Sequence, residues 1–160
     1  MSSFNRAPKP RIGEILIDMG LVTEEQVQQA LGVQETTKDT LGSIMIDMGC
    51  LSDSDVTRTL VMEYQLPYII LENYELDEEL VKLLSADFLH TNKILPFDRI
   101  GDTLLCAVTE VPREEILEEL SRQTGCKPGL YAASLSEVSR YLELLAPLGQ
   151  QAPAETVDQD

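Results

Sequence analysis

The sequence predicts a mixed α/β (α+β) fold, in which an N-terminal pair of repeated helical hairpins packs on a small C-terminal α/β subdomain. Three observations lead to this prediction: a tandem repeat over residues 11–34 and 40–63, a strand–turn–strand pattern over 93–108, and helix-cap signals between the apolar stretches. The chain has 160 residues, 43% of them hydrophobic, which is enough to bury a core in one domain or two small ones.

Each copy of the repeat predicts a helical hairpin. The two copies have equal length and align without a gap, and residues 35–39 separate them. Apolar residues at helical spacing end at Gly20 in the first copy and at Gly49 in the second, where a glycine typically closes a helix. Thr23 and Ser52 then open the second helix of each hairpin as N-cap residues. Because a single repeat cannot bury its apolar face alone, the two hairpins are expected to share one core.

The rest of the chain predicts a small sheet of three to four strands with helices on one face. In chain order the expected elements are an extended segment at 67–71, helices at 77–84 and 85–92, strands at 93–97 and 103–108 around a turn at Gly101, a helix from Pro112 to near Gly125, a strand at 127–133, and a helix from a capping box at Ser134 to Leu145. Pro96 places the first of these strands at a sheet edge or in a bulge.

These elements give the predicted domain organisation. It consists of a flexible N-terminus at 1–10, a tandem hairpin subdomain at 11–66, a small α/β subdomain at 67–146 and a disordered acidic tail at 147–160.

The charge and the cysteines exclude several classes of protein. With 12 Lys and Arg against 28 Asp and Glu, the net charge is −16, so phosphate backbones and anionic lipids are repelled. We therefore expect no DNA or RNA partner. We also expect no direct membrane insertion, since no apolar run approaches the ~20 residues that a membrane helix needs. The three cysteines are an odd number at wide spacing, which indicates reduced thiols in a cytoplasmic protein.

No motif for catalysis or metal binding is found in the sequence. His90 is the only histidine and has no Cys or Ser partner pattern, and the phosphate-binding motif GxxxxGK[ST] is absent. The acidic residues between Glu72 and Glu79 lack the spacing of a calcium loop, and the run from Glu110 to Glu119 is expected on the exposed side of a helix. The prediction is therefore a protein that is not an enzyme, with no catalytic and no metal-binding residues.

The repeat resembles the N-terminal domain of type II secretion and type IV pilus assembly ATPases, including its cyclic di-GMP-binding MshEN form. That form carries two copies of the pattern RLG-x-x-L-x-x-x-G-x-x-x-x-x-x-L-x-x-x-L-x-x-Q. The first copy, Arg11 to Gln34, fits closely, whereas the second has Thr40 in place of the opening arginine and Glu63 in place of the closing glutamine. The segments LPYIIL and 93–109 are also similar to this family, so the resemblance extends over about residues 10–145.

The resemblance implies a site for cyclic di-GMP as a ligand, with no cofactor required. The ligand-binding residues that it implies are Arg11, Ile12, Gly13, Leu16, Gly20, Gln34, Leu41, Gly42, Met45 and Gly49. An arginine can donate bidentately to guanine, and glycines let a ligand approach the backbone. The resemblance assigns no role to Thr40 or Glu63, and Lys38 and Arg58 are the nearby cations that would compensate if they faced the ligand.

Two functions follow from the resemblance and remain open at this point. One is a non-catalytic regulatory module that binds cyclic di-GMP through the two repeats. The alternative is a purely protein–protein docking adaptor to a secretion or pilus inner-membrane platform protein, without nucleotide binding. The partners implied are an ATPase motor domain or that platform protein, and the location implied is cytoplasmic, with recruitment to the inner membrane through the partner.

Overall fold

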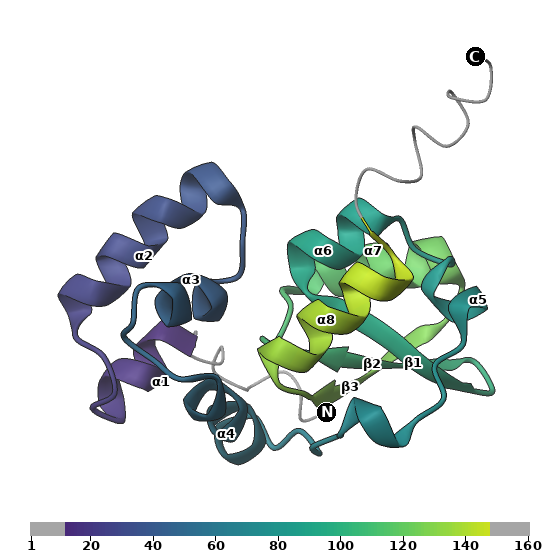
Figure 1. The fold of residues 1–160 in the computed structure, drawn as a ribbon, viewed down its shortest axis with the longest axis horizontal. Coiled ribbons are helices and arrows are strands. Elements are labelled where there is room, and N and C mark those ends of the chain that lie inside the picture. Colours follow the sequence, from purple (N-terminus) through teal and green to yellow (C-terminus); the bar gives the residue numbers. More distant parts are fainter. Residues whose placement is uncertain (1–11, 148–160) are drawn as a thin grey trace, which may run out of the picture.

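The structure, a computed structural model, describes residues 12–147. The predicted N-terminal segment 1–10, Arg11, and the predicted tail from residue 148 onward lie outside the described residues. Figure 1 shows two units side by side, which we name the hairpin unit (residues 12–66) and the sheet unit (residues 67–147). The mixed α/β fold class predicted from the sequence is confirmed.

Both copies of the repeat fold into helical hairpins of the same design. The helices are α1 (Ile12–Asp18), α2 (Glu24–Thr37), α3 (Leu41–Asp47) and α4 (Asp53–Glu63). Gly20 and Gly49 follow α1 and α3 with φ angles of +76° and +84°, a conformation that favours glycine. Thr23 and Ser52 open α2 and α4 as reciprocal capping boxes. The helix boundaries predicted from these local signals are therefore confirmed.

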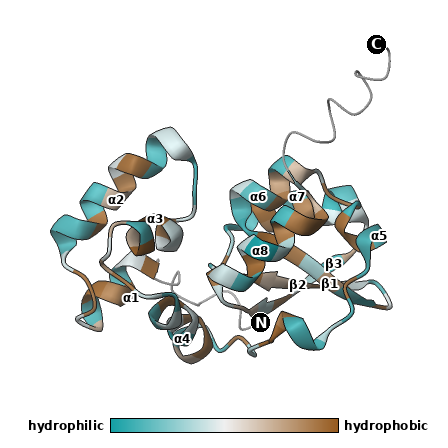
Figure 2. Cartoon of the chain, in the orientation of Figure 1, coloured by the Kyte–Doolittle hydropathy of each residue, from teal (hydrophilic) through white to brown (hydrophobic). Residues whose placement is uncertain are grey.

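The four helices share one hydrophobic core. Leu16, Met45 and Leu60 are completely buried in it. Figure 2 shows hydrophilic and hydrophobic residues alternating along α2, as expected for a helix with one buried side. The repeat therefore stabilises itself in the way its sequence predicts, by packing one hairpin against the other.

The sheet unit contains three strands with β2 in the middle. Its elements are a 3₁₀ turn η2 (Leu71–Asn73), α5 (Glu78–Val81), α6 (Ala86–Asn92), β1 (Ile94–Ile100), β2 (Thr103–Val108), α7 (Glu114–Thr124), β3 (Lys127–Ala132) and α8 (Leu135–Leu145). β2 pairs antiparallel with β1 and parallel with β3, and α7 connects the two parallel strands. β1 lies at the sheet edge and its pairing shifts between Pro96 and Asp98, so the edge and the bulge predicted at Pro96 are both present. In Figure 1, α6, α7 and α8 lie together above the strands.

Three elements of the sheet unit differ in length from the prediction. The helix expected at 77–84 is only Glu78–Val81, because Ser85 already serves as the N-cap of the next helix. β1 continues to Ile100 rather than ending at residue 97, since the turn to β2 needs only two residues. α7 begins at Glu114, two residues later than the expected start at Pro112.

A contact between distant residues explains two further differences. The predicted capping box at Ser134 forms only in part, because the Glu137 carboxylate accepts hydrogen bonds from the backbone N–H groups of Leu71 (3.0 Å) and Glu72 (3.1 Å). These bonds hold the start of η2. The segment expected to be extended at 67–71 therefore makes one isolated bridge, between Tyr68 and Ala132, before it turns into η2.

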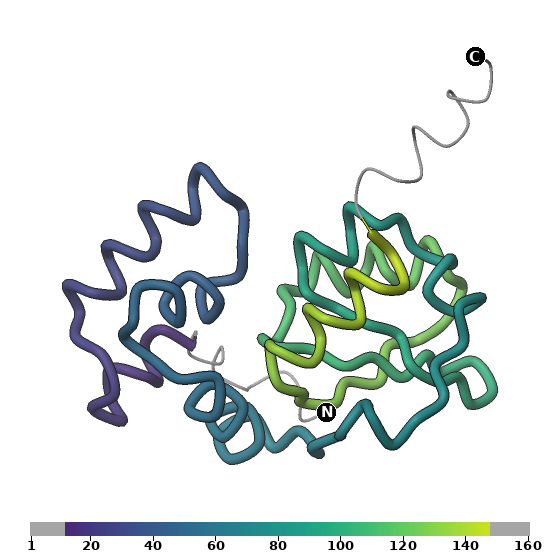
Figure 3. The backbone as a smooth tube through the Cα atoms, viewed as in Figure 1, coloured from purple at the N-terminus to yellow at the C-terminus, as the bar shows by residue number. Residues whose placement is uncertain are grey.

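The two units are joined by polar contacts as well as by the chain. The Asp53 carboxylate, at the start of α4, accepts from the backbone N–H groups of Leu135 (2.7 Å) and Ser136 (3.0 Å) at the start of α8. Figure 3 follows the backbone from α4 along the lower side of the molecule to α5. Because each unit has its own hydrophobic cluster and Leu66 packs against both, we propose residues 66–67 as the boundary between two subdomains.

The structure also shows the surroundings of the cysteines and of His90, and whether the described residues contain metal-binding groups or membrane-spanning helices. Cys50, Cys106 and Cys126 are free, and burial together with the neighbouring Cys126 raises the pKa of Cys106 to about 12. The ring of His90 is buried against the carbonyl oxygen of Ala146. Between residues 12 and 147, no group of three or more His, Cys, Asp or Glu side chains is arranged to hold a metal ion. Within the same range, none of the helices has the length and apolarity that crossing a bilayer requires.

Candidate functional site

Two cavities adjoin where the hairpin unit meets the sheet unit. The first, which we call the apolar cavity, has a volume of about 270 Å³ and is lined mainly by α1, α2 and the start of α3. The second, which we call the polar cavity, has a volume of about 520 Å³ and lies between the α2–α3 loop, the end of α6 and the start of α7. They share the lining residues Gln34, Glu110, Val111 and Arg113, and together they form one groove.

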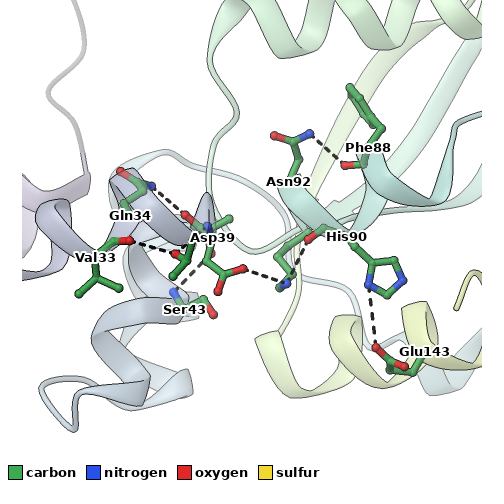
Figure 4. A network of polar contacts seen from close by, with 11 residues as sticks. Val33, Gln34, Asp39, Ser43, Phe88, His90, Asn92 and Glu143 are labelled. Carbon is green, nitrogen blue, oxygen red and sulfur yellow. Dashed lines mark hydrogen bonds and ion pairs between the residues drawn. The ribbon is translucent and has the colours of Figure 1, made fainter. Parts of the chain in front are cut away.

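A hydrogen bond from its side chain fixes Gln34 where the two cavities meet. It lies near the end of α2, and its Nε2 donates to the carbonyl oxygen of Asp39 at 2.9 Å. The Asp39 carboxylate lies 3.8 Å from the Lys93 ammonium, which donates to the carbonyl oxygen of His90 at 3.0 Å. Figure 4 shows these polar contacts passing from the hairpin unit to the sheet unit. The position of Gln34 is therefore tied to both units.

Glu110 reaches across from the sheet unit to the second hairpin. It lies in the loop between β2 and α7, and its Oε1 accepts a hydrogen bond from the backbone N–H of Gly42 at 3.3 Å. Burial raises the pKa of the nearby Tyr64, and the negative charge of Glu110 raises it further. One side of the apolar cavity therefore carries a fixed carboxylate beside a phenol that keeps its proton.

The structure brings four of the predicted ligand-binding residues together in this groove. Ile12, Gly13, Gln34 and Leu41 all line the apolar cavity. Leu16 and Met45 are instead fully buried in the hairpin core, Gly20 and Gly49 lie in exposed turns, and Gly42 faces Glu110 through its backbone N–H. Arg11 lies outside the described residues. The assignment of these residues to a ligand remains a prediction.

The two glycines near the starts of α1 and α3 differ in how closely the neighbouring helix packs against them. A Cβ on Gly13 would lie 3.1 Å from a methyl carbon of Val27, and one on Gly42 would lie 3.4 Å from a methyl carbon of Val56. In the first hairpin the helices therefore cross at a distance that favours a glycine, whereas the second hairpin has room for a Cβ in ordinary contact. This packing is tighter in the first hairpin than in the second.

The residues that depart from the family pattern also have visible roles. Thr40 is the N-cap of α3, and its hydroxyl accepts from the backbone N–H of Ser43 at 3.3 Å. Glu63 is exposed at the end of α4. Of the two nearby cations, Lys38 lines the polar cavity, whereas Arg58 lies 3.5 Å from Asp55 on α4. Only Lys38 is thus placed in the groove.

The groove residues that were not identified from the sequence include Tyr64, Glu110 and Arg113. Glu110 was expected on the exposed side of a helix, but it precedes α7 and lines both cavities. These residues come from the linker after α4 and from the loop before α7, far from the repeat in sequence. No local pattern connects them to the hairpins, and only Pro112, which delays the start of α7, marks the loop in the sequence.

Comparison with known proteins points to one family. The MshEN domain family matches residues 64–152, which is more than half of the chain. The type IV pilus assembly ATPase PilB of Myxococcus xanthus (strain DK1622) is 23% identical over 133 residues, which are 83% of this chain and 24% of PilB. The chain thus spans about a quarter of the length of that curated relative.

Solved structures share the fold across both units. The structure of MshE with cyclic di-GMP ("cdg") is 28% identical, has a TM-score of 0.59, and is matched over 85% of this chain and 99% of that one. The N-terminal domain of XpsE is 18% identical with a TM-score of 0.67, over 88% of this chain and 97% of that one. The first match takes in the helical hairpins as well as the sheet unit, so the resemblance drawn from the repeat and the match over residues 64–152 agree. The chain belongs to the MshEN domain family.

Proposed function

We propose that this chain is a non-catalytic regulatory module of a pilus or secretion ATPase, and that it binds cyclic di-GMP in the groove between its two units. The observation that supports this most directly is the convergence of Gly13, Gln34 and Leu41 from the repeats with Glu110 from the sheet unit. A protein that is 28% identical over most of the chain has been solved with this ligand.

The groove has the chemistry that a guanine nucleotide requires. The apolar cavity offers the aliphatic side chains of Ile12, Val27 and Leu31 to the face of a base. A guanine edge carries N–H donors, which a carboxylate such as Glu110 accepts, since its two oxygens provide about four acceptor positions. The Gln34 amide contributes an acceptor oxygen at the junction of the cavities. Ligand sites typically occupy about 300–1,000 Å³, a range that the apolar cavity of about 270 Å³ does not reach alone and that the groove reaches once the polar cavity of about 520 Å³ is included.

Binding in this place would couple the ligand to the arrangement of the two units. A ligand that touches α1 and α2 on one side and residues 110–113 on the other contacts both units at once. It shifts the equilibrium between two arrangements only by the difference in its affinity for them. A motor domain or another partner attached to the chain would then respond to that shift.

The test is calorimetric titration of the full chain with cyclic di-GMP, together with thermal unfolding. We expect heat of binding, a raised Tm, and affinity weakened about tenfold or more in Glu110→Gln, because one good hydrogen-bonding pair to a base is worth roughly 1–3 kcal/mol. Glu118→Gln, which changes the same charge at an exposed site on α7, is the matched control. Absence of heat and of any Tm shift at high micromolar ligand would contradict the proposal.

Two substitutions in the repeats sharpen this test. Arg11→Ala should weaken binding, and Thr40→Arg should strengthen it by restoring the arginine of the pattern. Because Thr40 caps α3, its replacement should also cost about 1 kcal/mol of folding stability. A variant that binds more tightly while it melts earlier would separate the two roles of position 40.

A second candidate function is supported by a different surface. Tyr68, Ile70 and Tyr74 are 51%, 44% and 41% exposed on the segment that leads to α5, and the exposed acids Glu72 and Glu75 lie among them. Exposed apolar side chains beside acids fit a partner segment that is both apolar and basic. In this alternative the chain is a docking adaptor, placed in the cytoplasm and recruited by the cytoplasmic part of an inner-membrane platform protein.

The two candidates are distinguished by separate variants. Ile70→Ser should abolish capture of the platform protein's cytoplasmic part and leave the affinity for cyclic di-GMP unchanged. Glu110→Gln should weaken the binding of cyclic di-GMP and leave capture of the platform protein unchanged. If Ile70→Ser and the wild type capture the partner equally, this surface is not the docking site.

A further inference from the structure

We infer that Arg113, together with Lys38, forms a phosphate-binding subsite in the polar cavity, and that it supplies the cation which the second repeat lacks at position 40. The inference rests on the proposed function, because it assigns the anionic part of the same ligand to a defined part of the groove. Arg113 belongs to the sheet unit and Lys38 to the hairpin unit, so the subsite would join the two units.

Both cations lie in the wall of the polar cavity, beside the residue that departs from the pattern. Arg113 lines both cavities, whereas Lys38 and Thr40 line the polar one only. An arginine at position 40 would therefore belong to the lining of the cavity that Arg113 already lines from the sheet unit. Arg113 can thus supply from the sheet unit the positive charge that an arginine at position 40 would supply from the hairpin unit.

The two cations have no carboxylate partner within the described part of the chain. Of the other seven Lys and Arg residues between 12 and 147, five lie within 4.0 Å of an acid, namely Arg58 of Asp55, Lys82 of Glu79, Lys93 of Asp39, Arg122 of Glu119 and Arg140 of Glu72, whereas Arg99 and Lys127, which line neither cavity, do not. No ion pair of this kind joins Arg113 or Lys38 to a residue between 12 and 147. In a chain with a net charge of −16, two unpaired cations at one cavity favour an anionic occupant there.

The backbone positions of these residues leave their side chains available. Arg113 is the N-cap of α7, but its side chain makes no capping hydrogen bond. Lys38 follows α2 with a φ of +66°, and its backbone N–H donates to the carbonyl oxygen of Gln34. A guanidinium can then donate bidentately to a phosphate, while the lysine adds a point charge.

Carboxylates that line the same cavity affect how strongly the subsite would bind a phosphate. Asp39 is occupied by Lys93 and Glu110 by the backbone of Gly42, but Glu35 and Glu115 also line the cavity and are exposed. Their negative charge opposes a phosphate. The subsite therefore predicts effects of opposite sign: removing Arg113 or Lys38 weakens binding, and neutralising Glu35 strengthens it.

The test is titration of the full chain with cyclic di-GMP and, in parallel, with guanosine, which has no phosphate, at two salt concentrations. We expect Arg113→Gln to raise the Kd for cyclic di-GMP roughly tenfold or more and to reduce its salt dependence, as loss of one charge-assisted hydrogen bond predicts. Lys38→Gln should have a smaller effect and Glu35→Gln should lower the Kd. The response to guanosine should stay the same in all three.

Matched variants make the outcome specific. Arg99→Gln removes an exposed cation on β1, whose side chain donates to the carbonyl oxygen of Gly101, and should leave the Kd unchanged. Arg113→Lys keeps the charge without the bidentate geometry and should bind between wild type and Arg113→Gln. Because Arg113 is exposed, its substitution should leave the Tm within the range of ordinary surface changes.

The inference and the proposed function fail in distinguishable ways. Wild type that does not bind cyclic di-GMP overturns both. Wild type that binds while Arg113→Gln binds equally well overturns the subsite alone, and so does a loss of affinity as large in Arg99→Gln as in Arg113→Gln.

Discussion

The two hairpins share one backbone design, yet the first contributes most of the helical residues that line the apolar cavity. Equivalent residues have nearly equal burial through the core: Ile12 and Leu41 are 5% and 6% exposed, and Leu16 and Met45 are both fully buried. The pattern then diverges in the second helix of each hairpin. Leu31 is partly exposed and lines the apolar cavity, whereas its counterpart Leu60 is fully buried.

The difference comes from what each hairpin is packed against. The second hairpin lies on the sheet unit, where α4 contacts both α8 and β3 and Asp53 caps the start of α8. The first hairpin carries Glu24 at the place of Asp53, and Glu24 is exposed. The repeated sequence therefore determines the fold of each hairpin, whereas packing against the sheet unit determines which helix faces remain accessible to a ligand. Each matched pair of positions offers a way to test this.

The largest expected difference is between the two equivalent leucines. Leu60→Ala should lower the free energy of unfolding by about 2–5 kcal/mol, because it leaves a cavity in a closed core. Leu31→Ala should cost clearly less, since its side chain already borders the groove, but it should weaken binding of cyclic di-GMP. Urea unfolding of the two variants checks the comparison, and equal losses of stability would contradict the asymmetry between the hairpins.

The next effect concerns the equivalent acids at the start of α4 and α2. Asp53→Ala should lower the free energy of unfolding by about 1–3 kcal/mol, because it leaves the N–H groups of Leu135 and Ser136 without their charged acceptor. Glu24→Ala, on an exposed helix start, should change it by about 0.5 kcal/mol or less. Thermal unfolding of both variants is the measurement. An Asp53 variant as stable as the Glu24 variant would show that the α4–α8 contact adds nothing to the joining of the units.

The sequence was sufficient where structure depends on residues close together in the chain. The glycines with positive φ, the capping boxes at Thr23 and Ser52, and the bulge at Pro96 all act within a few residues, so the helices and strands could be predicted. The groove was predicted only on the repeat side, through Ile12, Gly13, Gln34 and Leu41.

The other side of the groove depends on long-range contacts that leave no local signal. Glu110 bonds to the backbone of Gly42, 68 residues away, and Glu137 leaves its own capping box to bond to Leu71, 66 residues away. From the sequence, a glutamate near a helix start such as Glu110 is expected to be solvated. Its position in the groove depends on its contact with Gly42, which is distant in the chain.

The equivalent glycines provide a smaller and more specific test. Gly13→Ala should lower the free energy of unfolding by about 1–3 kcal/mol, since the new Cβ would crowd Val27 at 3.1 Å. Gly42→Ala meets Val56 at an ordinary 3.4 Å, and alanine favours helices over glycine by up to about 1 kcal/mol, so this variant should be neutral or slightly stabilised. Chemical unfolding resolves the sign. If both substitutions destabilise equally, the two helix crossings are equally tight and the proposed difference between them is wrong.

The smallest effect is a pH dependence at Tyr64, the residue that directly follows the second repeat. Tyr64 lines the apolar cavity, and burial with nearby carboxylates raises its pKa above the usual value of 10.0. The stability that this phenol contributes is complete below pH 10 and is lost as the pH rises through the higher pKa of the folded chain, since the unfolded chain releases the proton first. Tyr64→Phe should therefore lose less stability than the wild type as the pH rises above about 10. Cys106, with its pKa of about 12, gives the same alkaline loss in both proteins, so the difference between the two unfolding curves isolates Tyr64. Parallel curves would mean that the phenol is as solvated as a tyrosine in the unfolded chain, and that the apolar cavity is more open at Tyr64 than the structure shows.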